Sequence, residues 1–108
     1  MTHYKKGDVV LVLFKQSNNE EKKRPALIVL DIEDNDVVLV PITTTERTNK
    51  GDLKILKWKE AGLVAESWMR LAKVTTLNKT MITKLLGTLE NSDKENFVQG
   101  WNEVYKFD

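Results

Sequence analysis

The sequence has no cysteine and only one histidine among its 108 residues. Without cysteine there is no disulfide framework, no thiolate metal site and no cysteine nucleophile. A single histidine, His3, excludes a His-rich metal centre and a two-histidine ribonuclease site. Any catalytic chemistry in this chain must therefore come from other side chains.

Long apolar runs and a strong net charge are also missing. No stretch approaches the length that spans a membrane, and residues 1–6 lead into no signal-type hydrophobic segment. We therefore expect a soluble cytoplasmic protein. Seventeen basic and sixteen acidic residues leave a net charge of +1, so any binding to nucleic acid must come from a local patch.

The chain holds two prolines and five glycines, and no linker, repeat or low-complexity tract divides it. Its length fits one domain, residues 1–108, that is large enough to bury a core. Polar loops are expected at 15–24, which we predict to be mobile, and at 43–51. Between the turns, short apolar runs predict strands at 9–14, 26–30, 37–40 (closed by Pro41), 53–56, 67–71 and 81–89.

The C-terminal segment has a different period. In that segment, Ser92 and Glu95 match a capping box. Well before it in the chain, a short helical turn stopped by Gly62 is expected at 58–61. Many short strands with one terminal helix predict a mainly β protein, a small and strongly curled barrel. The helix should pack on the sheet through apolar residues at helical spacing, which are Phe97, Val98, Trp101, Val104 and Tyr105.

Arg24-Pro25, followed by the apolar run 26–30, is the most informative segment. Proline fixes φ, removes an amide donor and biases Arg24 toward extended geometry. The strand mouth therefore holds a permanently charged guanidinium with five donors, which suits a phosphate or a carboxylate. Taken alone, Arg24 is better explained as a solvated surface charge.

Arg24-Pro25-Ala26-Leu27 belongs to an ordered set of short motifs. With these spacings, from about Tyr4 to the terminal helix, the chain resembles the PemK/MazF (Kid-like) toxins. The resemblance implies an SH3-like barrel that forms a homodimer and cleaves single-stranded RNA at short motifs without a metal or other cofactor. It also implies a cognate antitoxin whose tail occupies the RNA groove. The other motifs are Gly7-Asp8, Pro41-Ile42-Thr43, Gly62-Leu63, Ser67…Arg70, Thr76-Leu77 and Gly87.

The resemblance also implies roles for single residues. Arg24 matches the arginine beside the scissile phosphate, and Thr43 matches the threonine of an Ile-Thr-Ser signature, with Thr44 in place of the commoner serine. Arg70 matches the strand arginine that is assigned the general-acid role in Kid-like members. Ala72 departs from the pattern, because Kid-like members have an aspartate there that is proposed as the general base.

Cleavage by the RNA's own 2′-hydroxyl gives a 2′,3′-cyclic phosphate. It needs a base, stabilisation of extra charge on phosphorus and a proton for the leaving 5′-oxygen. Arginine releases a proton poorly, so its stronger contribution is electrostatic. We hypothesise a charge clamp in which Arg24 and Arg70 hold the phosphate while Thr43 donates a hydrogen bond. The base stays open between Asp8 and Glu66, or neither is strong and the enzyme is slow.

A strand through Trp68, Arg70 and Ala72 should carry these residues on one face, with Met69 and Leu71 on the core side. Arg70 would then face the groove. Arg70 could equally form an ordinary ion pair with Glu60 or Glu66, and Lys73 could be a solvated edge-strand lysine. The residues expected to contact RNA are Lys22, Lys23, Thr44, Ser67, Trp68 and Lys73.

Two other functions are compatible with these motifs. The first is a catalytically weak barrel of the same family that binds RNA or a protein, because Ala72 removes an acid–base group. The second is the gyrase-poisoning activity of the related CcdB-like toxins. The Arg-Pro and Ile-Thr motifs belong to the RNA-cleaving branch, so the endoribonuclease is favoured.

Overall fold

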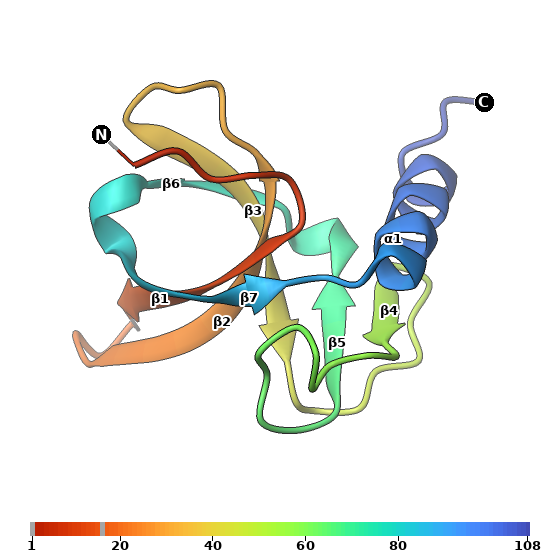
Figure 1. Ribbon diagram of the computed structural model, residues 1–108, viewed down its shortest axis with the longest axis horizontal. Coiled ribbons are helices and arrows are strands. Elements are labelled where there is room, and N and C mark those ends of the chain that lie inside the picture. The colour runs from red at the N-terminus through yellow and green to blue at the C-terminus, as the bar shows by residue number, and fades with distance from the viewer. Residues whose placement is uncertain (1, 16) are drawn as a thin grey trace.

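The computed structural model describes residues 2–15 and 17–108, and within them it contains an antiparallel sheet of seven strands and one α-helix. The prediction of a mainly β fold with a C-terminal helix is confirmed (Figure 1). Met1, from the N-terminal segment 1–6, and Gln16, from the predicted loop 15–24, lie outside the described residues. The elements are β1 (Asp8–Lys15), β2 (Glu21–Leu30), β3 (Asp36–Thr43), β4 (Asp52–Ile55), β5 (Ser67–Arg70), β6 (Thr75–Asn78), β7 (Ile82–Thr88) and α1 (Asn91–Val104), with two short 3-10 turns, η1 (Leu71–Lys73) and η2 (Lys79–Met81).

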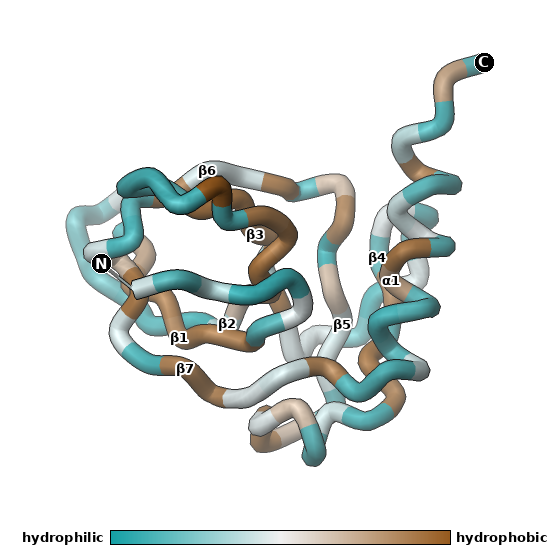
Figure 2. Tube along the Cα trace, turned by 45° about the horizontal axis from the view of Figure 1, so that its top comes forward, coloured by the Kyte–Doolittle hydropathy of each residue, from teal (hydrophilic) through white to brown (hydrophobic). Residues whose placement is uncertain are grey.

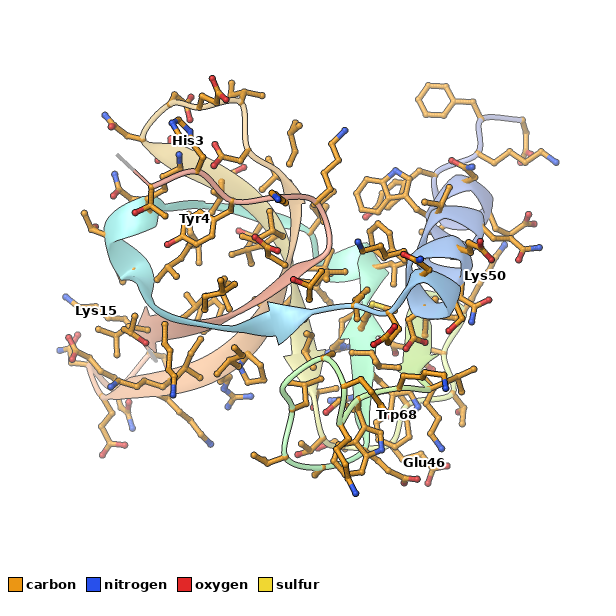
Figure 3. All side chains as sticks on the ribbon, viewed as in Figure 1. His3, Tyr4, Lys15, Glu46, Lys50 and Trp68 are labelled. Carbon is orange, nitrogen blue, oxygen red and sulfur yellow. The ribbon has the colours of Figure 1, made fainter. Side chains whose placement is uncertain are left out.

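The strands curl into a barrel. Their order is β4-β5-β3-β2-β1-β7, and β6 pairs with β3 on the edge away from β2. Figure 1 shows β1, β2, β3, β6 and β7 as a ring, and η2 joins its last two strands. Tyr4 reaches into this ring in Figure 3. Inside lies one hydrophobic cluster: Val10, Val12, Ala26, Ile28, Val37 and Leu39.

A second cluster lies on the opposite face of the same strands. Because side chains alternate along a strand, Val9, Leu27 and Val40 face away from the ring. Strands that contribute side chains to two cores are apolar on both faces, as the continuous apolar runs at 9–14 and 37–40 are. Phe97 and Trp101 of α1 pack against this second cluster, and Figure 2 shows hydrophobic and hydrophilic residues alternating along that helix.

Two strands run further than the sequence predicted. β2 begins at Glu21, which pairs with Lys15, so half of the predicted mobile loop at 15–24 (residue 15 and residues 21–24) is strand. Pro25 is tolerated because it pairs with Leu11 on one edge, while the β2–β3 ladder starts only at Ala26. β3 likewise continues through Pro41, since its far edge changes partner there from β6 to β5.

One strand was missed and one turn was predicted correctly. β6 has the sequence TTLN and alternates between half-buried and exposed, so its only strong apolar signal is Leu77. The helical turn closes where the Ala61 N–H donates to the Lys57 carbonyl at 3.2 Å, and Gly62 follows with φ +88°. A Cβ on Gly87 would come within 2.5 Å of the Ala61 carbonyl oxygen, so glycine lets these two backbones touch.

The capping-box prediction for α1 was wrong. The helix begins at Asn91, its N-cap residue is Glu90, and no side chain caps it. The Asp93 carboxylate instead turns inward, where it is fully buried and accepts the backbone N–H groups of Leu56 at 2.9 Å and Lys57 at 2.8 Å. These bonds tie the first turn of α1 to the end of β4. Within residues 2–15 and 17–108, no helix combines the length and the apolar character that crossing a membrane requires.

Asp31 makes a similar link at the other end of the molecule. Its nearly inaccessible carboxylate accepts the backbone N–H groups of Tyr4 at 2.8 Å and Glu33 at 2.7 Å, and pairs with Lys79 at 3.0 Å. The bond from Tyr4, helped by those from Glu33 and Lys79 and opposed by burial, lowers the pKa of Asp31 from 3.8 to about 2. Asp31 thus joins the N-terminal segment, the β2–β3 turn and η2.

Replacing Asp93 by alanine should destabilise the fold by about 2 to 4 kcal/mol, because the N–H groups of Leu56 and Lys57 lose a charged acceptor and a fully buried position is left empty. Ser92→Ala is the matched control. It should change the free energy of unfolding by less than about 0.5 kcal/mol, since Ser92 is exposed and makes no cap. Urea unfolding followed by circular dichroism measures both, and equal losses would contradict the assignment.

Acid should remove the contribution of the Asp31 carboxylate to the free energy of unfolding. Because the folded-state pKa is below 3.8, the stabilisation is complete above about pH 4 and is lost as the pH falls toward about 2. Between these pH values, the wild type should lose on the order of 1 kcal/mol more than Asp31→Asn, after allowance for solvent screening. Asp34→Asn, which alters an exposed carboxylate in the same turn, should retain the wild-type pH dependence of unfolding.

Candidate active site

The strand register places both predicted arginines on one face of the sheet. Residues directly opposite one another in an antiparallel pair share a face, as do residues two apart on one strand. The register pairs Ala26 with Pro41, Thr43 with Trp68, and Arg70 with Asp52. Following these pairs from β2 to β4 gives one face, here called the arginine face: Lys22, Arg24, Thr43, Trp68, Arg70, Asp52 and Lys54.

Packing of the alternate residues fixes this orientation. Ile42, Ile55 and Met69 each adjoin an arginine-face residue along their strands and are buried in the second core. The placement of Met69 and Leu71 in the core confirms that prediction. A register shift of one residue in any of these strands would bury charged side chains and expose hydrophobic ones. The arginine face therefore cannot exchange with the core face.

Arg70 is partly buried and already has a carboxylate partner. Its Nε–H donates to Asp52 Oδ1 at 3.3 Å, and the two side chains are 24% and 4% exposed. The partner is thus Asp52 rather than Glu60 or Glu66, since Glu66 pairs with Lys54 at 3.4 Å. The bond uses one of five guanidinium donors, and a phosphate needs only two of the other four.

Arg24 and Thr43 supply the other predicted donors. Arg24 is exposed on β2, across from Val12 of β1. Continuing the β2–β3 register by two residues runs Arg24 toward Thr43. The Thr43 Oγ1 accepts the backbone N–H of Thr45 at 3.1 Å, which leaves its O–H proton for another acceptor. Thr44 follows and is exposed.

Trp68 forms a covered part of the arginine face. Its side chain lies against the Lys54 ammonium, 5.7 Å from the ring centroid, and the residue is only 8% exposed. Such a ring supports its neighbours and offers little open area for a base to stack on. Lys54 is a cation of this face that the sequence analysis missed. The sequence did contain a sign of it, because Lys54 alternates with apolar residues in the run at 53–56 and follows Asp52 by two residues.

Three predicted RNA contacts lie elsewhere. Ser67 faces the core, is 1% exposed and donates its hydroxyl to the Ala65 carbonyl at 2.9 Å. Lys23 alternates with Lys22 and therefore lies on the opposite face of β2. Lys73 lies in η1, beyond the end of β5.

The predicted base Asp8 also lies away from the arginine face. It is 7% exposed, and its two oxygens accept the Lys5 N–H at 2.8 Å and the Thr88 hydroxyl at 3.1 Å. The carboxylate therefore closes a turn at the start of β1. Glu66, directly before β5 and paired with Lys54, is the predicted base that borders the arginine face.

Ala72 and His3 both lie outside the arginine face. Ala72 does not share a face with Arg70 as predicted, because β5 ends at Arg70 and Ala72 lies in η1, against Gly51. His3 lies 3.9 Å from Glu33 near the β2–β3 turn, and Figure 3 shows it at the opposite end of the molecule from Trp68. The one histidine of the chain therefore takes no part in this site.

With this geometry in place, the chain can be compared with known proteins. A family model described as the PemK-like, MazF-like toxin of type II toxin–antitoxin systems matches residues 5–100. The protein belongs to this family. The resemblance inferred from its motifs is therefore confirmed, and Gly7, Arg24, Thr43, Gly62, Arg70 and Gly87 all lie within the matched residues of this MazF-like chain.

Solved structures share the MazF-like fold. An endoribonuclease in complex with its cognate antitoxin, from a mycobacterial species, aligns with TM-score 0.75 and 19% identity over 95% of each chain. The Mycobacterium tuberculosis toxin MazF-mt6 aligns with TM-score 0.73 and 19% identity, over 92% of this chain and 98% of that one. At these identities the likeness shows a common fold. A comparison with curated proteins gave no match.

Proposed function

We propose that this MazF-like toxin is an endoribonuclease that cleaves single-stranded RNA at short sequence motifs and is neutralised by a cognate antitoxin. The observation that carries the proposal is the arginine face, where Arg24, Thr43 and Arg70 present guanidinium and hydroxyl donors on one side of the sheet. Proteins of the same fold include a mycobacterial endoribonuclease and another bound to its cognate antitoxin.

In the proposed reaction the RNA 2′-hydroxyl attacks the adjacent phosphorus, the 5′-oxygen leaves, and a 2′,3′-cyclic phosphate forms. Arg24 and Arg70 stabilise the extra negative charge on the phosphoryl oxygens, and the Thr43 hydroxyl donates to one of them. Donors fixed by strand pairing need little reorganisation as this charge develops. Glu66 is the carboxylate that we assign as acceptor of the 2′-hydroxyl proton, the leaving 5′-oxygen takes up a proton from water, and the step uses no metal.

We further propose a homodimer located in the cytoplasm, where messenger RNA is found. β7 is the last strand in the sheet order, and its Leu85 is 54% exposed. An edge strand with an exposed leucine is a suitable surface for a second copy of the chain.

A catalytically weak RNA-binding barrel is the second candidate. One observation favours it: Ala72 lacks the expected carboxylate, and the Arg70 guanidinium is already paired with Asp52. This candidate predicts RNA binding without cutting, so a cleavage assay separates the two functions.

Arg24→Ala and Arg70→Ala should each lower the cleavage rate of a long single-stranded RNA by about 100-fold or more, because each removes a donor worth roughly 3 kcal/mol in the transition state. The assay is run in EDTA, and the products are tested for 2′,3′-cyclic phosphate ends. Lys106→Ala, an exposed charge beyond α1, is the control and should cut like the wild type.

Wild-type cleavage that survives both arginine substitutions would dismiss the clamp. RNA that stays intact with the wild type but is still bound would favour the binding barrel.

A further inference from the structure

Asp52 supplies a carboxylate beside Arg70, although Ala72 stands at the sequence position where an aspartate was expected. It is directly across from Arg70 in the β4–β5 pair, with its carboxylate 3.3 Å from the guanidinium Nε. Ala72, at the position where an aspartate was expected, packs against Gly51, and Gly51 immediately precedes Asp52. A carboxylate is therefore present beside Arg70, but it comes from the neighbouring strand.

The backbone around this pair is fixed on both sides. The Leu71 N–H donates to the Gly51 carbonyl at 2.7 Å, and the Asp52 N–H donates to the Asn49 carbonyl at 3.0 Å. A Cβ on Gly51 would come within 2.8 Å of the Ala72 Cβ, so the approach of β4 to η1 needs a glycine. The pairing of Asp52 with Arg70 is therefore set by the fold and does not depend on chance contact of two surface side chains.

Burial makes this ion pair different from an exposed one. The Asp52 side chain is 4% exposed, and a carboxylate so far from water requires a partner. Arginine has many rotamers when it is free in solvent, and ordering it opposes binding. Held by Asp52 through Nε, Arg70 loses much of this freedom before any substrate arrives.

The contact with Asp52 also leaves free the edge of the Arg70 guanidinium that can bind a phosphate. Nε–H points to one side of the planar group, whereas the two Nη atoms form a fork at its end that fits two phosphate oxygens. Asp52, Arg70, Thr43 and Trp68 all belong to the arginine face, so the pair borders the proposed site and not the core.

We propose that Asp52 is a positioning residue, which holds the Arg70 guanidinium in the orientation that receives the scissile phosphate. β4 thereby supplies the carboxylate that Ala72 lacks. The proposal rests on the proposed endoribonuclease function. Asp52 acts through Arg70 and makes no contact with the RNA.

The test compares Asp52→Ala and Asp52→Asn with the wild type by steady-state cleavage kinetics, with the folded fraction measured by circular dichroism. Asp52→Ala should lower kcat at least tenfold and change KM less than about threefold, because Arg70 is misoriented mainly as charge develops. Asp52→Asn keeps an acceptor oxygen of the same shape, so its rate should lie between the other two.

A double-mutant cycle separates positioning from stability. In an Arg70→Lys background, where there is no planar fork to orient, Asp52→Ala should change kcat less than twofold. Asp31→Asn breaks a different buried ion pair, near the β2–β3 turn, and should leave kcat per folded molecule unchanged. In ¹H–¹⁵N spectra, the Arg70 Nε–H should exchange slowly with water in the wild type and rapidly in Asp52→Ala.

An active wild type with undiminished kcat in Asp52→Ala overturns this inference alone. Equal losses from Asp52→Ala in the wild-type and Arg70→Lys backgrounds also overturn it, because Asp52 would then act independently of Arg70. RNA left intact by the wild type overturns the proposed function and this inference with it.

Discussion

The structure depends on one strand, β3, which pairs along both edges and exchanges one of its partners at Pro41. β2 lies on one edge, while β6 and then β5 lie on the other. The first part of β3 closes the ring, and its last residues carry β5 and β4 beyond the ring. This single register builds two cores on opposite faces and determines which side of the sheet holds Arg24, Thr43 and Arg70.

The two arginines of the arginine face differ in how far they are buried and in how freely they can meet a ligand. Arg70 is partly buried and fixed by Asp52, whereas Arg24 is exposed on β2. For the proposed nuclease, the fixed arginine needs no further ordering, and the exposed one is ordered when RNA binds. The ion pair with Asp52 is therefore compatible with phosphate binding, because it uses one donor of the guanidinium.

Much of this fold was predictable from local pattern. Apolar runs located most strands, helical spacing located α1, and period-two alternation placed Met69 in the core opposite Arg70. The family motifs led to Arg24, Thr43 and Arg70, but whether these residues act on RNA stays a prediction. The remainder was set by contacts between distant segments. Asp52 and Arg70 meet only because β4 pairs with β5, and β6 was missed because its pairing with β3 compensates for its weak apolar pattern.

The most direct test of the account compares neighbouring lysines on β2, which the pleat sends to opposite faces. Lys22 lies on the arginine face and Lys23 does not. Binding of an uncleavable 2′-O-methyl RNA should weaken in Lys22→Ala, with the slope of log affinity against log salt falling by about 1, and should stay unchanged in Lys23→Ala. Equal losses in the two variants, or a larger loss in Lys23→Ala, would contradict the assignment of the arginine face as the RNA surface.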